Sequence, residues 1–105
     1  MAADWDEVDL MDKDEHIEQA SRAMKAMSHP LRLKILCTLG KTSLNVHDLA
    51  KHVGSSQSNV SHHLATLRDK GVLVAKKDAK NVYYQLRDER MLGMIDMLYN
   101  LFCAK

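Results

Sequence analysis

Residues 54–71 read GSSQSNVSHHLATLRDKG, and this stretch decides the predicted fold. Its apolar positions recur at i, i+3, i+4 and i+7, which predicts one buried helix face formed by Val60, His63, Leu64 and Leu67. Ser55 and Ser56 are preferred N-cap residues, and Gly71 is suited to end the helix. The opposite face of this helix is therefore expected to point outward, with Ser58, Ser61, His62 and Arg68 on it.

Three further helices are predicted before this one. Helical spacing of apolar residues covers about residues 14–27, and Ser28-His29-Pro30 then interrupts it. Pro30 suits the first turn of a second helix that ends at Gly40, with His29 as its cap. A third, short helix is predicted over about 46–52.

Two strands and a last helix are predicted after the helix within residues 54–71. The β-branched and aromatic runs at 72–74 and 82–86 flank the segment KKDAKN at 76–81, which is typical of a hairpin with a basic tip. Apolar residues return to helical spacing between Met91 and Phe102. The predicted fold is therefore mainly α with a small β-hairpin, a winged helix-turn-helix in the order ααααββα.

The charges are divided between the two ends of the chain. Residues 1–18 contain eight acids and one base, a net charge of −7, whereas the rest contains fourteen bases and six acids, a net charge of +8. We expect an acidic flexible tail over 1–13 and one winged helix-turn-helix domain over 14–105. A basic domain favours a polyanionic partner such as nucleic acid. The sequence has neither a membrane-spanning run nor a signal pattern, so a cytoplasmic location is expected.

The predicted recognition helix and hairpin supply the candidate DNA contacts. Side chains that can hydrogen-bond to base edges in the major groove are Gln57, Ser58, Asn59, Ser61 and His62. Cations that can reach phosphates are Lys51, Arg68, Lys76, Lys77 and Lys80. Alone, the lysines would be read as a solvated face, but their position beside a recognition helix favours DNA binding. His62 is either a DNA contact or merely exposed, whereas His63 is assigned to packing.

Five segments of the chain resemble the ArsR/SmtB family of bacterial repressors. They are HPLRLKIL at 29–36, DLA at 48–50, SQSNVSHHLATL at 56–67, GVL at 71–73 and VYYQL at 82–86. The resemblance covers nearly everything after residue 14. It implies a homodimer formed through the first and last helices, which binds a palindromic operator in double-stranded DNA and leaves it when an inducer arrives.

The apolar stripes of the first and last helices independently require a partner surface, because so short a chain cannot cover both. The residues expected at a dimer interface are Ile17, Ala20, Met24, Met91, Met94, Ile95 and Leu98.

The metal-sensing sites of the family do not match this sequence. Thiolate sensors carry Cys-Val-Cys in the third helix, where this chain has Asn45-Val46-His47. A second family site needs Asp-x-His and a histidine pair on the last helix, which contains no histidine here. We therefore expect neither of these metal sites and no cofactor.

Cys37 and Cys103 are the candidate sensing residues. Free cysteine is often simply buried in a core, which is the alternative interpretation. Their positions in the second and last helices are similar to the dithiol branch of the family, the BigR, SqrR and HlyU-type repressors. That resemblance implies sensing of persulfides, polysulfides or oxidants through a disulfide or sulfur-chain bridge within one subunit. Lys34 and Lys41, at i−3 and i+4, are candidates to stabilise a Cys37 thiolate.

Three functions other than a sulfur-sensing repressor are considered for this sequence. One is a metal- or metalloid-responsive repressor, and another is a DNA-binding protein insensitive to redox state. An enzyme is not expected, because the sequence lacks a glycine-rich phosphate loop and a nucleophile elbow.

Overall fold

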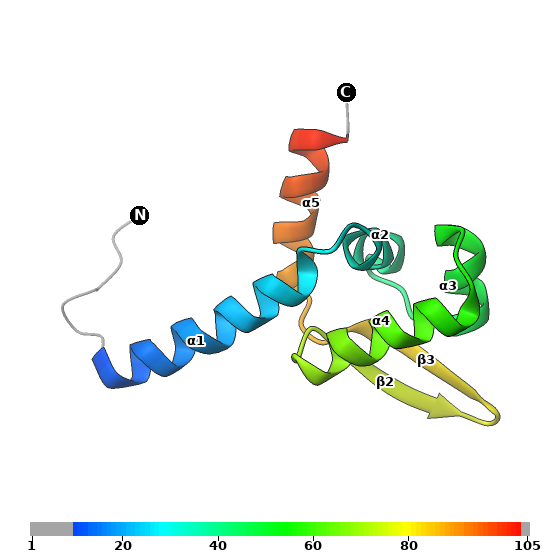
Figure 1. The fold of residues 1–105 in the computed structure, drawn as a ribbon, viewed down its shortest axis with the longest axis horizontal. Helices are drawn as coiled ribbons and strands as arrows, with labels where there is room; N and C mark the ends of the chain where they lie inside the picture. The colour runs from blue at the N-terminus through cyan, green and yellow to red at the C-terminus, as the bar shows by residue number, and fades with distance from the viewer. Residues whose placement is uncertain (1–9, 104–105) are drawn as a thin grey trace.

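The computed structural model describes residues 10–103, and within this range it contains five helices and a three-stranded sheet (Figure 1). The helices are α1 (Leu10–Met27), α2 (Pro30–Leu39), α3 (Val46–Val53), α4 (Gln57–Asp69) and α5 (Arg90–Phe102). The strands are β1 (Leu44–Asn45), β2 (Leu73–Asp78) and β3 (Asn81–Leu86). The helix α1 begins at Leu10, so residues 10–13 of the expected tail are helical, whereas residues 1–9 lie outside the described part.

Capping groups set the helix boundaries, and the sequence predicted the N-caps of α2 and α4. The Nδ1 atom of His29 accepts a hydrogen bond from the Leu31 N–H at the start of α2 (3.1 Å). The hydroxyl of Ser56 accepts one from the Asn59 N–H at the start of α4 (3.1 Å). At the end of α3, Gly54 has φ +72°, a left-handed conformation that glycine adopts without a steric penalty.

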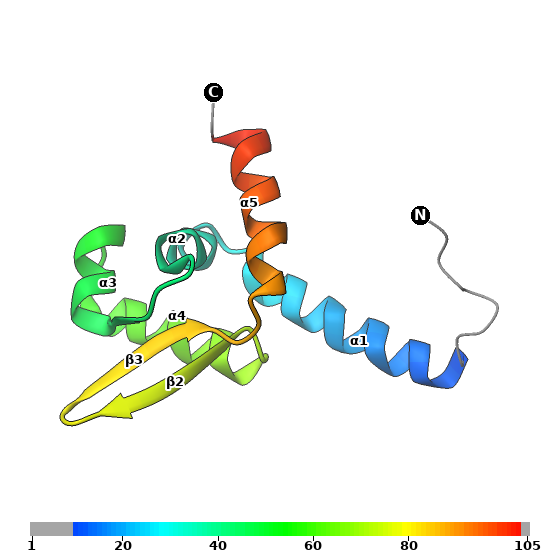
Figure 2. The ribbon, with the colours of Figure 1, turned by 180° about the vertical axis from the view of Figure 1, so that it is seen from behind.

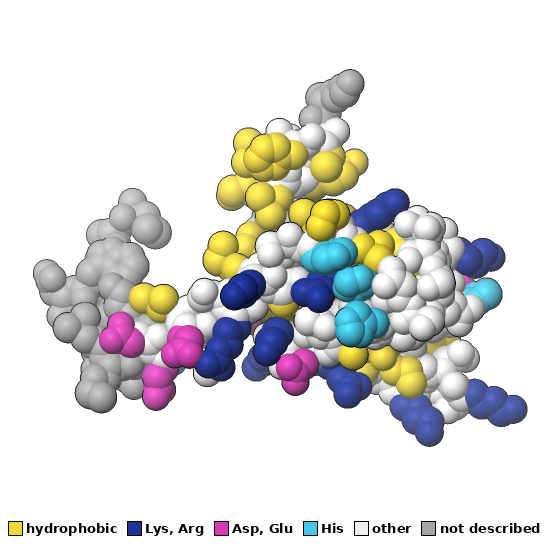
Figure 3. Space-filling view, in the orientation of Figure 1, with side chains coloured by type: hydrophobic (Ala, Val, Ile, Leu, Met, Phe, Trp, Pro, Cys, Tyr) yellow, Lys and Arg dark blue, Asp and Glu magenta, His cyan; other side chains and the backbone are white. Residues whose placement is uncertain are grey.

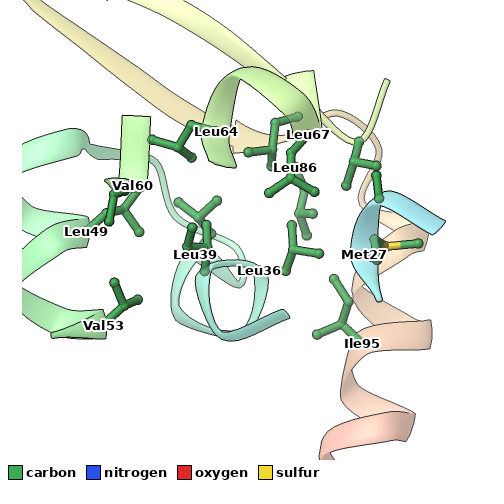
Figure 4. Close-up of a cluster of buried hydrophobic side chains, with 14 of the residues drawn as sticks. Met27, Leu36, Leu39, Leu49, Val53, Val60, Leu64, Leu67, Leu86 and Ile95 are labelled. Carbon is green, nitrogen blue, oxygen red and sulfur yellow. The ribbon is translucent and has the colours of Figure 1, made fainter. Parts of the chain in front are cut away.

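The core lies between α2, α3 and α4, and α5 closes one end of it (Figure 4). On α4, the inward side chains Leu64 and Leu67 are completely buried, as the i, i+3, i+4, i+7 pattern predicts. They point toward Leu36 and Leu39 of α2, and Ile95 of α5 lies at the α1 end of the same cluster. Burial of this common apolar surface fixes α4 in its orientation and leaves its other face exposed.

The hairpin is longer than predicted and its turn is tighter. The strands β2 and β3 pair antiparallel from Leu73 opposite Leu86 to Asp78 opposite Asn81, so only Ala79 and Lys80 form the turn. This turn lacks glycine and asparagine, and Ala79 has φ +56°, so the usual sequence signal was absent. The two-residue strand β1, which was not predicted, pairs with β3 through Tyr83 and Tyr84. We call β2, β3 and their turn the wing.

Two helices extend away from this body. Figures 1 and 2 show α1 leaving it on one side while the wing extends on the other, and α5 rising between them. Among the side chains of α1 described in 14–27, those that reach the core lie in its C-terminal half: Ala26 and Met27 are buried, and Ala23 packs against them. None of the described helices combines the length and the apolar character needed to cross a membrane.

Candidate nucleic-acid interface and cysteine pair

The outward face of α4 carries the side chains predicted to contact bases. All are exposed: Gln57, Ser58, Asn59, Ser61 and His62. Two of them already have partners in the free protein. The amide of Asn59 donates to the Ser55 hydroxyl (2.9 Å), and the amide of Gln57 donates to Nδ1 of His47 on α3 (3.0 Å). The side chains of Ser58, Ser61 and His62 form no hydrogen bond with another residue of the range 10–103, so none would have to break before they reach a DNA groove.

The cationic side chains predicted to contact phosphates lie on α3, on α4 and in the wing. Lys76 and Lys77 lie on β2, Lys80 is in the wing turn, Lys51 is on α3, and Arg68 is in the last turn of α4. All five are exposed, and none forms an ion pair with another residue of the range 10–103. Their full charges are therefore available to a polyanion.

His63 lies behind this surface and packs, as expected. It is 7% exposed, and its ring centroid is 4.5 Å from that of His29. The Nε atom of Arg32 donates a hydrogen bond to Nδ1 of His63 (3.1 Å), which requires the neutral imidazole. Burial, and then the nearby His29, Arg32 and His62, hold the pKa of His63 below its ordinary value of 6.5.

This environment makes the free energy of unfolding depend on pH. Between the lowered native pKa of His63 and 6.5, the unfolded state binds more protons than the native state, so stability rises with pH across this window. We expect stability to fall when the pH is lowered from about 7.5 to about 5. Urea unfolding at several pH values would measure the slope. His63→Gln should flatten it, whereas His16→Gln, at an exposed position on α1, should not; equal slopes for His63→Gln and the wild type would contradict the assignment.

The two cysteines are on neighbouring elements. Cys37 is on α2 and Cys103 directly follows α5; both are free and exposed. Asp96, Tyr99 and Cys103 fall at i, i+3 and i+7, so they share one side of α5. Asp96 and Tyr99 line a cavity of about 270 Å³ together with Cys37, so this side of α5 faces α2.

The surroundings of Cys37 favour the thiol over the thiolate. Partial burial raises the pKa of Cys37 most, and the nearby Cys103 and Asp96 raise it further. The expectation that Lys34 stabilises a thiolate is wrong for this conformation, because its Nζ atom donates to the Val53 carbonyl across on α3 (3.1 Å). Sequence reasoning missed Asp96, because nothing local links it to Cys37.

Comparisons with known proteins agree with this geometry. Residues 29–75 match the family described as "Bacterial regulatory protein, arsR family". The chain is 40% identical over 87 residues to the HTH-type transcriptional regulator YgaV of Escherichia coli (strain K12), an alignment that covers 82% of this chain and 88% of YgaV. The chain belongs to the arsR family.

Two solved structures, of HlyU and of BigR, have the same fold. Reduced HlyU from Vibrio cholerae N16961 superimposes with a TM-score of 0.78 at 36% identity, over 88% of this chain and 97% of HlyU. The transcriptional repressor BigR from Xylella fastidiosa gives a TM-score of 0.77 at 28% identity, over 93% of this chain and all of BigR. The predictions of a winged helix-turn-helix fold and of similarity to the BigR and HlyU type are thereby confirmed.

The apolar stripes of this arsR-family chain are mostly uncovered. On α1, Ile17 and Met24 are 53% and 62% exposed, and Ala20 is exposed too. On α5, Met94 and Leu98 are each 38% exposed, and Met91 is half-buried. Ile95 was expected at the dimer interface, but it is 2% exposed because it packs into the core of its own chain, so that expectation is corrected. The exposed apolar residues of α5 also include Met97, Leu101 and Phe102.

Proposed function

We propose that this arsR-family regulator is a homodimeric repressor that leaves its operator when Cys37 and Cys103 are bridged by a reactive sulfur species or an oxidant. The observation that carries the proposal is the pair of free, exposed thiols where α2 meets α5: Cys37 lines the cavity between these helices, and Cys103 directly follows α5 on the side that faces α2. The similarity to BigR and to reduced HlyU supports it.

DNA binding in this proposal uses α4 and the wing. The exposed hydroxyl, amide and imidazole groups of α4 read base edges in the major groove of a palindromic operator. The unpaired cations of α3, α4 and the wing contact phosphates and fix the register. The second half-site is read by the second copy of the chain.

The chemistry of bridging is a two-electron oxidation. Two thiols form one disulfide and lose two protons and two electrons, which hydrogen peroxide accepts as it is reduced to water. With an organic trisulfide, two thiols instead form a bridge with one inserted sulfur atom and release two thiol molecules. A direct disulfide requires Cα atoms roughly 4.4–6.8 Å apart, and an inserted sulfur spans a longer gap.

Bridging acts on DNA affinity through the angle between α5 and the body. Helix α2 packs against α3 and α4, whereas α5 carries the exposed apolar face proposed for dimerisation. A bond from α2 to the end of α5 therefore changes the separation of the two α4 helices, which must match half-sites about 34 Å apart. A coupling free energy of about 1–3 kcal/mol, the usual range, would reduce affinity about 5- to 150-fold.

Fluorescence anisotropy with a labelled operator tests the proposal. Reduced protein is compared at one salt concentration with protein treated with an organic trisulfide, hydrogen peroxide or zinc, and intact mass is measured in parallel. We expect the trisulfide to weaken binding, with a mass gain of one sulfur less two hydrogens in each subunit, and Cys37→Ser and Cys103→Ser each to abolish the response. A response to zinc alone, or one that persists in both variants, would overturn the sensing mechanism; an unchanged affinity would leave a redox-insensitive DNA-binding protein.

A further inference from the structure

A groove lined by cations lies between α1 and α4, outside the surface predicted from sequence. Its volume is about 350 Å³, and none of the acidic side chains described in residues 14–103 lines it. The residues of this α1–α4 groove are Arg22, Lys25, Ala26, Arg32, Thr66 and Lys70. Figure 3 shows Lys and Arg side chains gathered on this face, where α1 joins the body.

Part of this positive charge is uncompensated. Arg22 forms an ion pair with Glu18, and the Nζ atom of Lys70 lies 3.5 Å from Oδ2 of Asp69. Both pairs are exposed to solvent, so each neutralises the positive charge only weakly. Lys25 makes no ion pair with any residue of 10–103. Within residues 10–103, Arg32 donates to two neutral acceptors, the His63 ring and the Ala26 carbonyl, and to no carboxylate, so its charge is not neutralised there. The groove therefore presents a net positive field to solvent.

The groove is continuous with the DNA-facing side of α4. His62, Thr66 and Lys70 follow one another at intervals of four residues, so they form one row along α4. His62 belongs to the predicted recognition surface, and Thr66 and Lys70 line the groove. The wing extends from the body on the side away from α1 (Figure 1), so the groove and the wing flank α4.

We propose that the α1–α4 groove binds phosphates of the DNA backbone, as a second set of backbone contacts on the side of α4 away from the wing. This inference rests on the DNA binding of the proposed function. The occupant is assigned as DNA, rather than a free phosphorylated molecule, because the groove continues the α4 row that faces the duplex. Backbone contacts on both sides of a recognition helix fix its position in the major groove.

The salt dependence of DNA binding measures these contacts. Each neutralised phosphate contributes about 0.9 to the slope of log Kobs against log salt concentration. The double variant Lys25→Gln/Lys70→Gln of the full chain should reduce the slope by about 1 to 2 and weaken binding equally on operator and unrelated DNA. The control is Lys41→Gln, measured like the double variant on reduced protein, so that its position near Cys37 does not affect the comparison. It removes an exposed lysine that lies outside the groove and outside the predicted DNA contacts, so the slope should be unchanged.

The outcomes separate the two proposals. Wild-type protein that binds DNA, with an unchanged slope in the double variant and an unaltered circular dichroism spectrum, would overturn the groove assignment alone. Wild-type protein that binds no DNA would overturn the groove and the proposed function together. A titration with inorganic phosphate followed by NMR adds a third arm: saturable binding lost in the double variant, with no change in the DNA slope, would assign the groove to a soluble phosphorylated ligand instead.

Discussion

Leu98→Glu is expected to convert the protein into a monomer and to weaken operator binding by about 100-fold or more, because two linked half-sites typically gain that much through avidity. Leu98 is 38% exposed, and it lines an apolar cavity of about 200 Å³ between α1 and α5 with Met24 and Met94. Beyond it, Leu101 and Phe102 are 69% and 81% exposed. A second copy of the chain that covers this face would bury the new carboxylate without a partner, at a large cost in free energy.

Asn100→Glu is the matched control for this prediction. It adds the same charge to the same helix, but residue 100 is exposed and lies about 160° around α5 from residue 98, away from the apolar stripe. Sedimentation equilibrium would give the oligomeric state, and anisotropy with full and half operators would give the affinities. Leu98→Glu should bind the full operator and the half operator with similar, weak affinity, whereas Asn100→Glu should behave as the wild type. A dimeric Leu98→Glu protein with unchanged affinity would exclude this face as the interface.

The sequence was sufficient to predict α4 and its buried face, because the patterns that define this helix involve residues close together in the chain. The buried positions of α4 follow helical spacing, and its N-cap Ser56 accepts a hydrogen bond from Asn59, only three residues further along the chain. The N-cap of α2 by His29 is local in the same way. Such contacts depend on residues a few positions apart, so a pattern along the chain contains them.

Other features depend on residues far apart in the chain, and sequence spacing does not contain them. The hydrogen bond between Gln57 and His47 and the effect of Asp96 on Cys37 both require knowledge of which helices pack together. Periodicity also identifies an apolar face without saying what covers it. Ile95 and Leu98 belong to one stripe, yet one is buried in its own chain and the other is partly exposed.

Leu64→Ala is expected to lower the free energy of unfolding by about 2–5 kcal/mol, the usual range for removing a buried leucine side chain. Leu64 is completely buried on the inner face of α4, and Figure 4 shows it directed at the core beside Val60 and Leu39. The substitution leaves a cavity under the recognition helix without altering its outer face. Because small domains are stabilised by only about 5–15 kcal/mol, a detectable fraction of the variant should be unfolded at moderate temperature.

Ser61→Ala on the same helix separates stability from recognition. Ser61 is exposed and has no hydrogen-bond partner among the described residues other than through the helix backbone, so its removal should change stability by less than about 0.5 kcal/mol. Urea unfolding at one fixed protein concentration, which keeps any contribution of dimerisation constant, would compare the two variants. Leu64→Ala should lose stability, but its folded fraction should keep its affinity for the operator. Ser61→Ala should keep its stability and bind the operator more weakly. If Leu64→Ala unfolded at the same urea concentration as Ser61→Ala, the inner face of α4 would not hold the recognition helix in place.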